Sequence, residues 1–384
     1  MSAAVRPRSV ALVASSFLPR VGGVEEHVRH LAAELAARGH RVSVWAVDRG
    51  DPPADPGRLP GVTVRYLPAP LPAGTPGGVA RFAAALPAAV RAWERARRAD
   101  RPDVLHVQCF GPNGTWATVL AATHRVPLVV GTHGETFMDD HRVLERSALQ
   151  RRALRAALRR AEAVTACSAY ARDDLRRFGP LPDVAEVVGN GVDAAEPAGE
   201  APRWLPGRTL VALGRLVEVK GFDLLLRAYA AAGTALDGVS LVVAGDGPAR
   251  ASLQALADEL GLGGRVVLPG ALDRREVVAV LARAEALVVP SRREAFGIVV
   301  LEGMRAGIPV VATSADGVPE VVTGGVDGLL VDPTDAAALA DALVRVTGDA
   351  RLRCRLGEAG AATAAAYTWQ RVADRVEAVY RRLA

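Results

Sequence analysis

Short apolar runs alternate with longer segments in which apolar residues recur every three or four positions along most of this chain. Such runs are typical of strands buried on both faces of a sheet, and such segments are typical of helices with one buried face. In the first half the runs are 10–16, 41–47, 62–67, 104–108, 127–131, 163–168 and 185–188, and the helical segments are 24–38, 79–99, 114–124 and 141–160. Alternating strands and helices predict a parallel sheet covered by helices on both faces.

The alternation stops at residues 194–207, which are rich in Ala, Pro and Gly. It restarts with apolar runs at 209–214, 241–245, 265–268, 286–290, 310–313 and 328–331, and with helical segments at 222–235, 249–260, 274–283, 335–347, 351–366 and 369–383. A chain of 384 residues is also longer than one hydrophobic core normally serves. We therefore predict an α/β protein with two Rossmann-like, doubly wound domains, 1–195 and 205–366, joined by a linker.

Composition narrows the protein class further. Half of the residues are hydrophobic, which suits a large core and argues against global disorder. No apolar run is long enough to span a membrane, and the basic and then apolar N-terminus suits a first strand better than a signal peptide, so we expect a cytoplasmic protein. The cysteines at 109, 167 and 354 show no metal-binding spacing and no even disulfide set, and we expect small residues that are at least partly buried.

The basic residues are almost all arginine, because Lys220 is the only lysine among 47 of them. The formal net charge is +5, but aromatic residues are few and are not interleaved with the basic ones. This pattern gives little support to nucleic-acid binding. It does draw attention to Lys220, since arginine supplies general positive charge elsewhere in the chain.

Candidate site residues follow strands, where open parallel sheets bind their ligands. Gly22 and Gly23 follow the first strand, and they either let a diphosphate or sugar approach the backbone or form a plain tight turn. His133 lies in the sequence THGE after the fifth strand. It either orients a sugar hydroxyl or acts as a base, or it is a structural histidine.

The stretch SRREAFGIVVLEG at 291–303 runs from a strand end into a helix. Glu294 lies in the loop and Glu302 lies inside the helix. The backbone N–H groups between them, at Phe296, Gly297, Ile298 and Val299, have no helical partner and form an anion site. A sugar nucleotide suits this arrangement, with its diphosphate in the middle and hydroxyls at either carboxylate; the alternative is two glutamates that share no ligand.

Two cations follow the first strand of the second half in the sequence GRLVEVKG. Arg215 comes just after the strand and Lys220 just before a helix. If both lie near Glu294, they can bind and neutralise a diphosphate leaving group. The alternative is two solvated cations, although the singular lysine favours the functional interpretation.

The predicted helix 141–160 is strongly basic. Arg151, Arg155 and Arg159 lie on one stripe, beside a stripe that contains Leu154 and Leu158. Adjoining basic and apolar surfaces allow peripheral contact with an anionic membrane, such as the inner membrane face, or with an acidic acceptor. The alternative is an ordinary solvated helix face.

Together these motifs resemble those of the retaining glycosyltransferases of family four, which have the GT-B fold. The E-x7-E pattern within SRREAFGIVVLEGMRAGIPVVAT is the strongest part, and GGVEEHV, GTHGE, NGVD, GRLVEVKG, AGDGP and GLLVD support it. The resemblance implies two Rossmann-like domains that face each other across a cleft. It also implies that the last segment, 367–384, crosses back onto the first domain.

The resemblance further implies roles for single residues. Arg215 and Lys220 hold the nucleotide diphosphate, the N–H groups from Phe296 to Val299 cap its phosphates, and Glu294 and Glu302 contact the donor sugar and the ribose. His133 lies beside the transferring sugar, and Gly22 and Gly23 lie near the diphosphate and the acceptor. Asp316 and Gly317 stand where a pair of glycines is common in the family, close to the donor site.

The expected reaction is transfer of a hexosyl unit from a UDP- or GDP-sugar to an acceptor hydroxyl with retention of the anomeric configuration. The acceptor is a saccharide, a lipid-linked saccharide or a small metabolite. No metal or cofactor is expected, because no Asp-x-Asp metal motif stands at a strand end in the right context. The pair Asp139-Asp140 follows a loop and suits the surface. The alternatives are a non-catalytic nucleotide-binding module and a phosphorylase-like enzyme in which Lys220 holds pyridoxal phosphate.

Overall fold

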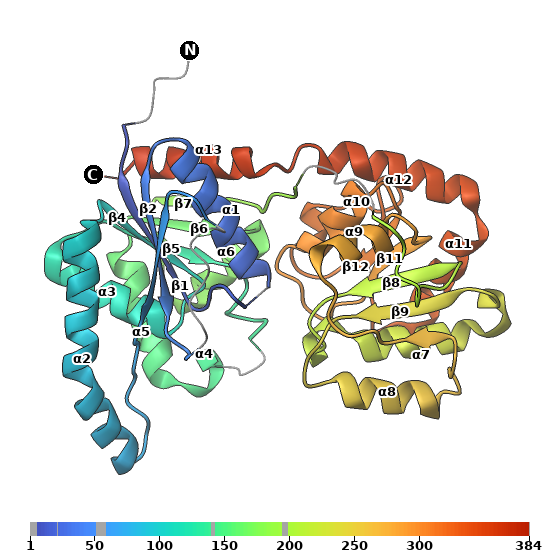
Figure 1. The fold of residues 1–384 in the computed structure, drawn as a ribbon, viewed down its shortest axis with the longest axis horizontal. Helices are drawn as coiled ribbons and strands as arrows, with labels where there is room; N and C mark the ends of the chain where they lie inside the picture. Colours follow the sequence, from blue (N-terminus) through green and yellow to red (C-terminus); the bar gives the residue numbers. More distant parts are fainter. Residues whose placement is uncertain (1–5, 21, 51–58, 140–142, 194–198, 384) are drawn as a thin grey trace. The chain divides into compact units, whose positions relative to one another are not determined.

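A computed structural model shows that the chain divides into two compact units (Figure 1). One unit contains Met1–Gly189 together with Trp369–Ala384, and the other contains Asn190–Thr368. The structure describes residues 6–20, 22–50, 59–139, 143–193 and 199–383.

The first unit is built on a seven-stranded parallel sheet with the order β3-β2-β1-β4-β5-β6-β7. Its strands are β1 (Ser9–Ala14), β2 (Arg41–Val47), β3 (Val62–Leu67), β4 (Val104–Gln108), β5 (Leu128–Thr132), β6 (Ala163–Ala166) and β7 (Val184–Val187). Its helices are α1 (Gly23–Ala37), α2 (Pro76–Asp100), α3 (Pro112–His124), α4 (Val143–Arg146), α5 (Ala148–Arg160), α6 (Ala169–Asp174), the short 3₁₀ helix η2 (Leu175–Phe178) and α13 (Trp369–Arg381). In the centre, Val10 of β1 pairs with Val42 and Val104, and the continuous apolar runs follow from burial on both faces.

Helix α13, which ends the chain, packs on the first unit. Its residues Val372, Val376 and Tyr380 are buried in one cluster with Val28 and Leu31 of α1, and Figure 1 shows the red α13 beside the blue α1. Polar contacts fix the same helix, because Arg38 pairs with Asp374 at 2.6 Å and His40 contacts Glu377 at 3.0 Å. This docking confirms that the last helix belongs to the first domain.

The second unit contains a six-stranded parallel sheet with the order β10-β9-β8-β11-β12-β13. Its strands are β8 (Thr209–Leu213), β9 (Ser240–Ala244), β10 (Val266–Val267), β11 (Ala286–Val289), β12 (Val310–Thr313) and β13 (Leu329–Val331). Its helices are η3 (Glu218–Lys220), α7 (Phe222–Ala232), η4 (Gly233–Leu236), α8 (Arg250–Glu259), α9 (Arg274–Leu281), α10 (Ile298–Arg305), η5 (Val318–Glu320), α11 (Ala336–Gly348) and α12 (Ala350–Ala364). The prediction of two doubly wound α/β domains is confirmed.

Several details differ from the predictions. The basic segment is two helices, α4 and α5, because the Ser147 hydroxyl accepts the Gln150 N–H at 3.2 Å and starts a new helix. Packing divides the chain at Gly189–Asn190 rather than at 195, since the Val192 N–H donates to the Tyr367 carbonyl within the second unit. Parts of the predicted loop 51–61 and of the linker 194–207 lie outside the described residues.

Two expectations about side chains are wrong. Leu154 and Leu158 of α5 are buried in the core of the first unit, so they offer no apolar stripe to a membrane. Cys354 is exposed on α12, where it contacts Glu358 at 3.1 Å, whereas Cys167 is buried. The helix faces that carry these residues are set by packing against the sheets, which residue type alone does not reveal.

Candidate functional site

The second unit brings Lys220 and Glu294 into direct contact. Lys220 ends η3, which follows β8, and Glu294 lies in the loop between β11 and α10. The Lys220 Nζ is 2.6 Å from Glu294 Oε2, and the Ser291 hydroxyl donates to the same oxygen at 3.0 Å. Glu294 is only 7% exposed, so this ion pair fixes a carboxylate and an ammonium at the carboxyl end of the sheet, where the sequence placed them.

Close packing holds the two loops together at Gly221. Its φ of +67° is left-handed, and a Cβ there would lie 2.0 Å from the Pro290 carbonyl oxygen. The neighbouring Arg292 donates its backbone N–H to the Val219 carbonyl at 2.8 Å and forms a two-pronged ion pair with Asp223, both contacts at 2.7 Å. Only glycine allows the backbone after Lys220 to approach the β11 loop this closely.

Asp316 supports Glu294 from a third loop. Its carboxylate accepts the Glu294 N–H at 2.9 Å and pairs with Arg293 at 2.8 Å, while the Gly317 N–H donates to the Glu294 carbonyl at 3.0 Å. Asp316 itself adopts a left-handed φ of 55°, which Asp tolerates better than most residues. The departure from a glycine pair therefore has a structural role, which the sequence alone did not indicate.

Helix α10 begins at Ile298 after a left-handed Gly297 with φ +88°. Within the described ranges, the N–H groups of Gly297, Ile298 and Val299 donate no hydrogen bond, which leaves the expected anion-binding donors available. The Phe296 side chain is buried, with its ring 6.0 Å from that of Tyr367. The helix start is thus anchored by an aromatic contact.

The other two charged candidates of the second unit are Glu302, inside α10, and Arg215, just after β8. Glu302 pairs with Arg274 of α9 at 2.5 Å, and Arg274 is also 4.0 Å from Asp193. Arg215 follows β8 by two residues and its side chain is exposed. The structure therefore joins Glu294 to Lys220 directly, while Glu302 is held by a cation that the sequence analysis did not single out.

In the first unit, His133 is held in the loop after β5. Its Nε2 is 2.9 Å from Gln108 Oε1 at the end of β4, and the His27 ring lies 4.5 Å away, centroid to centroid. Burial lowers the pKa of His133 well below its usual value, and the neighbouring His27 and His106 add to this effect. His133 is therefore a neutral imidazole at neutral pH, oriented by Gln108, a residue that sequence reasoning missed.

Glu135 organises the same loop. Its carboxylate accepts the backbone N–H groups of Phe110 at 2.7 Å and His133 at 2.8 Å, and the Thr132 hydroxyl at 3.0 Å. Burial raises the pKa of this carboxyl above its usual value, although the hydrogen bonds by themselves would lower it. Glu135 thus ties the loops after β4 and β5 together and sets the position of His133.

Gly22 and Gly23 lie at the start of α1. Gly22 is the N-cap with an extended φ of −177°, so its conformation does not require glycine. The lack of space does require glycine, because a Cβ on Gly22 would lie 2.6 Å from the Glu25 carboxylate. The Ser16 hydroxyl contacts the same carboxylate. The glycine lets an acidic side chain lie over the first turn of the helix, where it complements the helix dipole.

A second histidine, His106, is fully enclosed beneath this site. Its Nδ1 is 2.8 Å from the Tyr380 hydroxyl of α13, and its Nε2 is 3.0 Å from the Thr165 hydroxyl. Burial lowers its pKa to about 3 from 6.5. His106 is therefore neutral in the folded protein throughout the physiological range.

We expect His106 to make the folded state sensitive to acid. His106 binds a proton at about pH 6.5 in the unfolded chain but only near pH 3 in the folded chain. Its contribution to the free energy of unfolding is therefore fully present above pH 6.5 and is lost as the pH falls from 6.5 toward 3. The loss approaches about 1.4 kcal/mol per pH unit for this one group. Urea unfolding at pH 7.5 and 5.5 measures it, and His106→Asn should show a shallower pH dependence; an unchanged slope would contradict the assignment.

The described residues contain neither a cluster of metal ligands nor a membrane-spanning helix. In the part of the chain that the structure describes, no group of three or more His, Cys, Asp or Glu side chains could hold a metal ion. None of the described helices is both long enough and apolar enough to cross a membrane.

Most of the chain is similar in sequence to known glycosyltransferases. The family described as "Glycosyltransferase Family 4" matches residues 21–196, and the family "Glycosyl transferases group 1" matches residues 205–363. The chain is 30% identical to alpha-D-kanosaminyltransferase of Streptomyces kanamyceticus over 93% of this chain and 98% of that protein. It is 34% identical to a glycogen synthase of Mycobacterium tuberculosis over 94% of this chain and 91% of that one.

Among solved structures, the chain is similar to the Anabaena protein HepE in complex with UDP and glucose. The TM-score is 0.78 at 19% identity, with 97% of this chain and 99% of that chain covered. At this identity the likeness concerns the fold alone.

Proposed function

Because this chain belongs to the family 4 glycosyltransferases and has the GT-B fold, we propose that it transfers a hexosyl unit from a UDP- or GDP-sugar to an acceptor hydroxyl with retention. The observation that carries the proposal is the Lys220–Glu294 pair at 2.6 Å beside the start of α10. Lys220 and the N–H groups at the start of α10, which donate no hydrogen bond within the described residues, suit a diphosphate. The buried Glu294 carboxylate suits sugar hydroxyls. The UDP complex of a protein with this fold supports the same class of donor.

In this proposal the second unit stabilises the leaving group. Lys220, Arg215 and the α10 N–H groups bind the diphosphate, and they stabilise the negative charge that develops on it as the glycosidic bond breaks. Glu294 binds hydroxyls of the donor sugar, and Glu302 binds the ribose once Arg274 shares or releases it. No metal or cofactor takes part, since the cations and the helix start supply the positive charge.

The first unit supplies a neutral imidazole. With the His133 Nε2–H donating to Gln108 Oε1, the Nδ1 of His133 accepts a hydrogen bond from a hydroxyl of the transferring sugar. A neutral His133 does not compete with the acceptor for a proton. The acceptor hydroxyl attacks the anomeric carbon from the side of the leaving diphosphate, and a phosphate oxygen takes its proton.

A panel of UDP-, GDP- and ADP-sugars tests the proposal. We expect a thermal shift with a UDP- or GDP-sugar and release of the nucleotide in the presence of acceptors, both unaffected by EDTA. Product NMR should show that the donor's anomeric configuration is retained. Inversion would contradict the mechanism, and nucleotide binding without release from any donor would favour a binding module instead.

Peripheral contact with the inner face of a membrane stays a prediction. With Leu154 and Leu158 buried, it rests on the exposed arginines of α5 alone, including Arg152 and Arg159. Such contact would be electrostatic and would weaken with added salt.

A further inference from the structure

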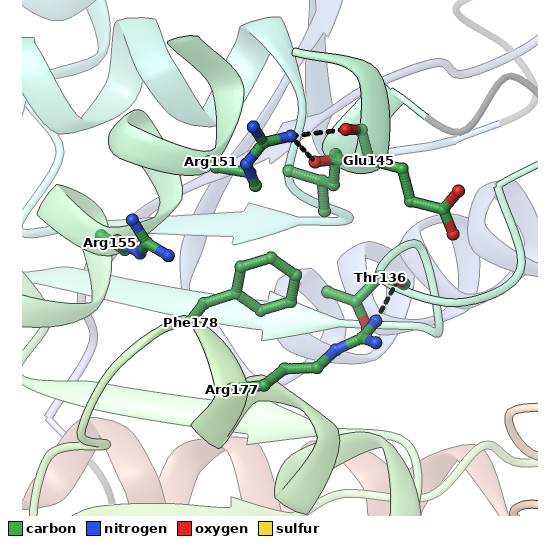
Figure 2. Close-up of a pocket in the computed structure, with 7 residues that line it drawn as sticks. Thr136, Glu145, Arg151, Arg155, Arg177 and Phe178 are labelled. Atoms are coloured by element: carbon green, nitrogen blue, oxygen red, sulfur yellow. Dashed lines mark hydrogen bonds between the residues drawn. The ribbon is translucent and has the colours of Figure 1, made fainter. Parts of the chain in front are cut away.

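The first unit contains a cavity of about 360 Å³ that the proposed donor chemistry does not use. Its walls include the side chains of Thr136, Glu145, Arg151, Arg155, Arg177 and Phe178 (Figure 2). Small-molecule sites typically begin at about 300 Å³. The cavity is therefore large enough for a ligand of about the size of a sugar with one substituent.

Three arginines approach this cavity, and two of them form no ion pair with any carboxylate of the described residues. Arg151 donates to the backbone carbonyls of Leu144 and Glu145, at 2.9 and 2.5 Å, which orients it and leaves its charge in place. Within the described ranges, Arg155 forms no ion pair and no hydrogen bond, and Figure 2 shows it at the edge of the cavity. Guanidinium groups without a carboxylate partner are well suited to bind phosphate, and of these two only Arg151 is held in a fixed orientation.

The third arginine is fixed in place by three partners. Arg177 donates to the Thr136 carbonyl, pairs with Asp174 at 3.1 Å, and lies over the Phe178 ring at 5.1 Å. Its charge is thus partly balanced, but its guanidinium plane is held against an aromatic wall. The Glu145 carboxylate also belongs to the cavity, and Figure 2 shows it on the side away from Arg155.

We propose that this cavity binds a phosphomonoester group on the acceptor, which deepens and rests on the proposed glycosyltransferase function. A phosphomonoester carries close to two negative charges at pH 7, matching the two uncompensated arginines, Arg151 and Arg155. Phe178 and Leu144 provide apolar surface for the carbon skeleton that carries the phosphate. A phosphorylated sugar-sized alcohol fits this combination better than a neutral sugar does.

The cavity also adjoins the predicted reaction centre of this unit. Thr136 follows His133 by three residues, and the turn between them is tight, since Phe137 and Met138 both donate N–H groups to the Gly134 carbonyl. Three residues span at most about 11 Å even when extended. An acceptor whose phosphate lies between the arginines therefore extends its hydroxyls toward the loop that carries His133.

The orientation of α5 makes it possible to distinguish ligand binding in the cavity from binding to a membrane surface. The helix directs Leu154 and Leu158 into the core. Arg152 and Arg155 are both exposed, but only Arg155 lines the cavity. Arg152 is thus a matched control for Arg155, because it is the same residue type on the same helix, outside the cavity.

Titration calorimetry with the full chain tests the proposal without any donor. The probes are inorganic phosphate, glucose 6-phosphate and glucose. We expect glucose 6-phosphate and phosphate to bind and glucose to bind at least tenfold more weakly than its phosphate. Arg155→Gln should weaken phosphate binding by about 10- to 100-fold through loss of a charged hydrogen bond, and Arg152→Gln should leave it unchanged.

Two results would overturn the proposal. In one, a UDP- or GDP-sugar binds and is turned over but neither phosphate probe binds, so the family function stands and the cavity assignment fails. In the other, the protein binds phosphatidylglycerol vesicles and this binding falls equally in Arg152→Gln and Arg155→Gln, with no binding of soluble phosphate. That outcome would make the basic face of α5 a membrane contact and not an acceptor site.

Discussion

Lys220→Ala is expected to lower the rate of sugar transfer by about 10²–10³-fold, the effect of removing one electrostatic donor to a developing charge. Lys220 is the cation held 2.6 Å from Glu294, and no other lysine is present in the chain to replace it. Initial rates at saturating donor measure the change. A loss mainly in kcat indicates a role in the transition state, and a change in KM alone would indicate simple ground-state binding.

Glu294→Gln provides the complementary test. It keeps the shape of the side chain and removes the charge that pairs with Lys220, and we expect a similar loss of turnover. Because the residues touch, their effects should not add, and the double variant should be little slower than either single one. Arg227→Ala is the control, since Arg227 is exposed on α7 of the same unit. Full activity in both Lys220→Ala and Glu294→Gln would exclude this pair from the mechanism.

Folding stability must be measured alongside activity for these variants. Glu294 is buried, and loss of Lys220 leaves it with the Ser291 hydroxyl and the Asp316-supported backbone. A buried carboxylate without its cation destabilises the fold. Lys220 is itself a quarter exposed, so water reduces that effect, and the variant should remain folded at 25 °C.

Gly221→Ala is expected to destabilise the second unit and to reduce activity at the same time. A left-handed φ alone costs an alanine about 1–2 kcal/mol. At Gly221 the new Cβ would also lie 2.0 Å from the Pro290 carbonyl oxygen, and relieving such a clash costs about 1–3 kcal/mol more. The backbone shift that relieves it separates Lys220 from Glu294.

Gly238 offers a close control for this change. It has a φ of +74°, but a Cβ there would meet nothing within 4 Å. Gly238→Ala should therefore show only the conformational cost and keep full activity. Urea unfolding and initial rates of both variants provide the comparison. Equal destabilisation by the two substitutions would show that the contact with Pro290 does not constrain the loop.

Much of this architecture follows from local pattern. The strands are apolar runs because parallel strands between helix layers are buried on both faces, and 10–16 and 286–290 therefore predicted β1 and β11 closely. Gly39, with its φ of +87°, lies just after the end of α1, a position at which helices commonly have a left-handed glycine. Lys220 and Glu294 were identifiable because both follow strands of one sheet, and the ends of parallel strands converge.

The residues that position the site could not be found in this way. Glu294 is held by Asp316, which lies in another loop. His133 is oriented by Gln108 at the end of β4, and its loop is tied to Phe110 by Glu135. Such contacts depend on which strands become neighbours in the sheet, and residue spacing carries no record of that order. The sequence alone thus determined the two α/β domains and the polar residues at their strand ends. Tertiary packing decided which of these residues meet, which face of α5 is buried and which arginines surround a cavity, because burial and charge compensation arise only once distant segments pack together.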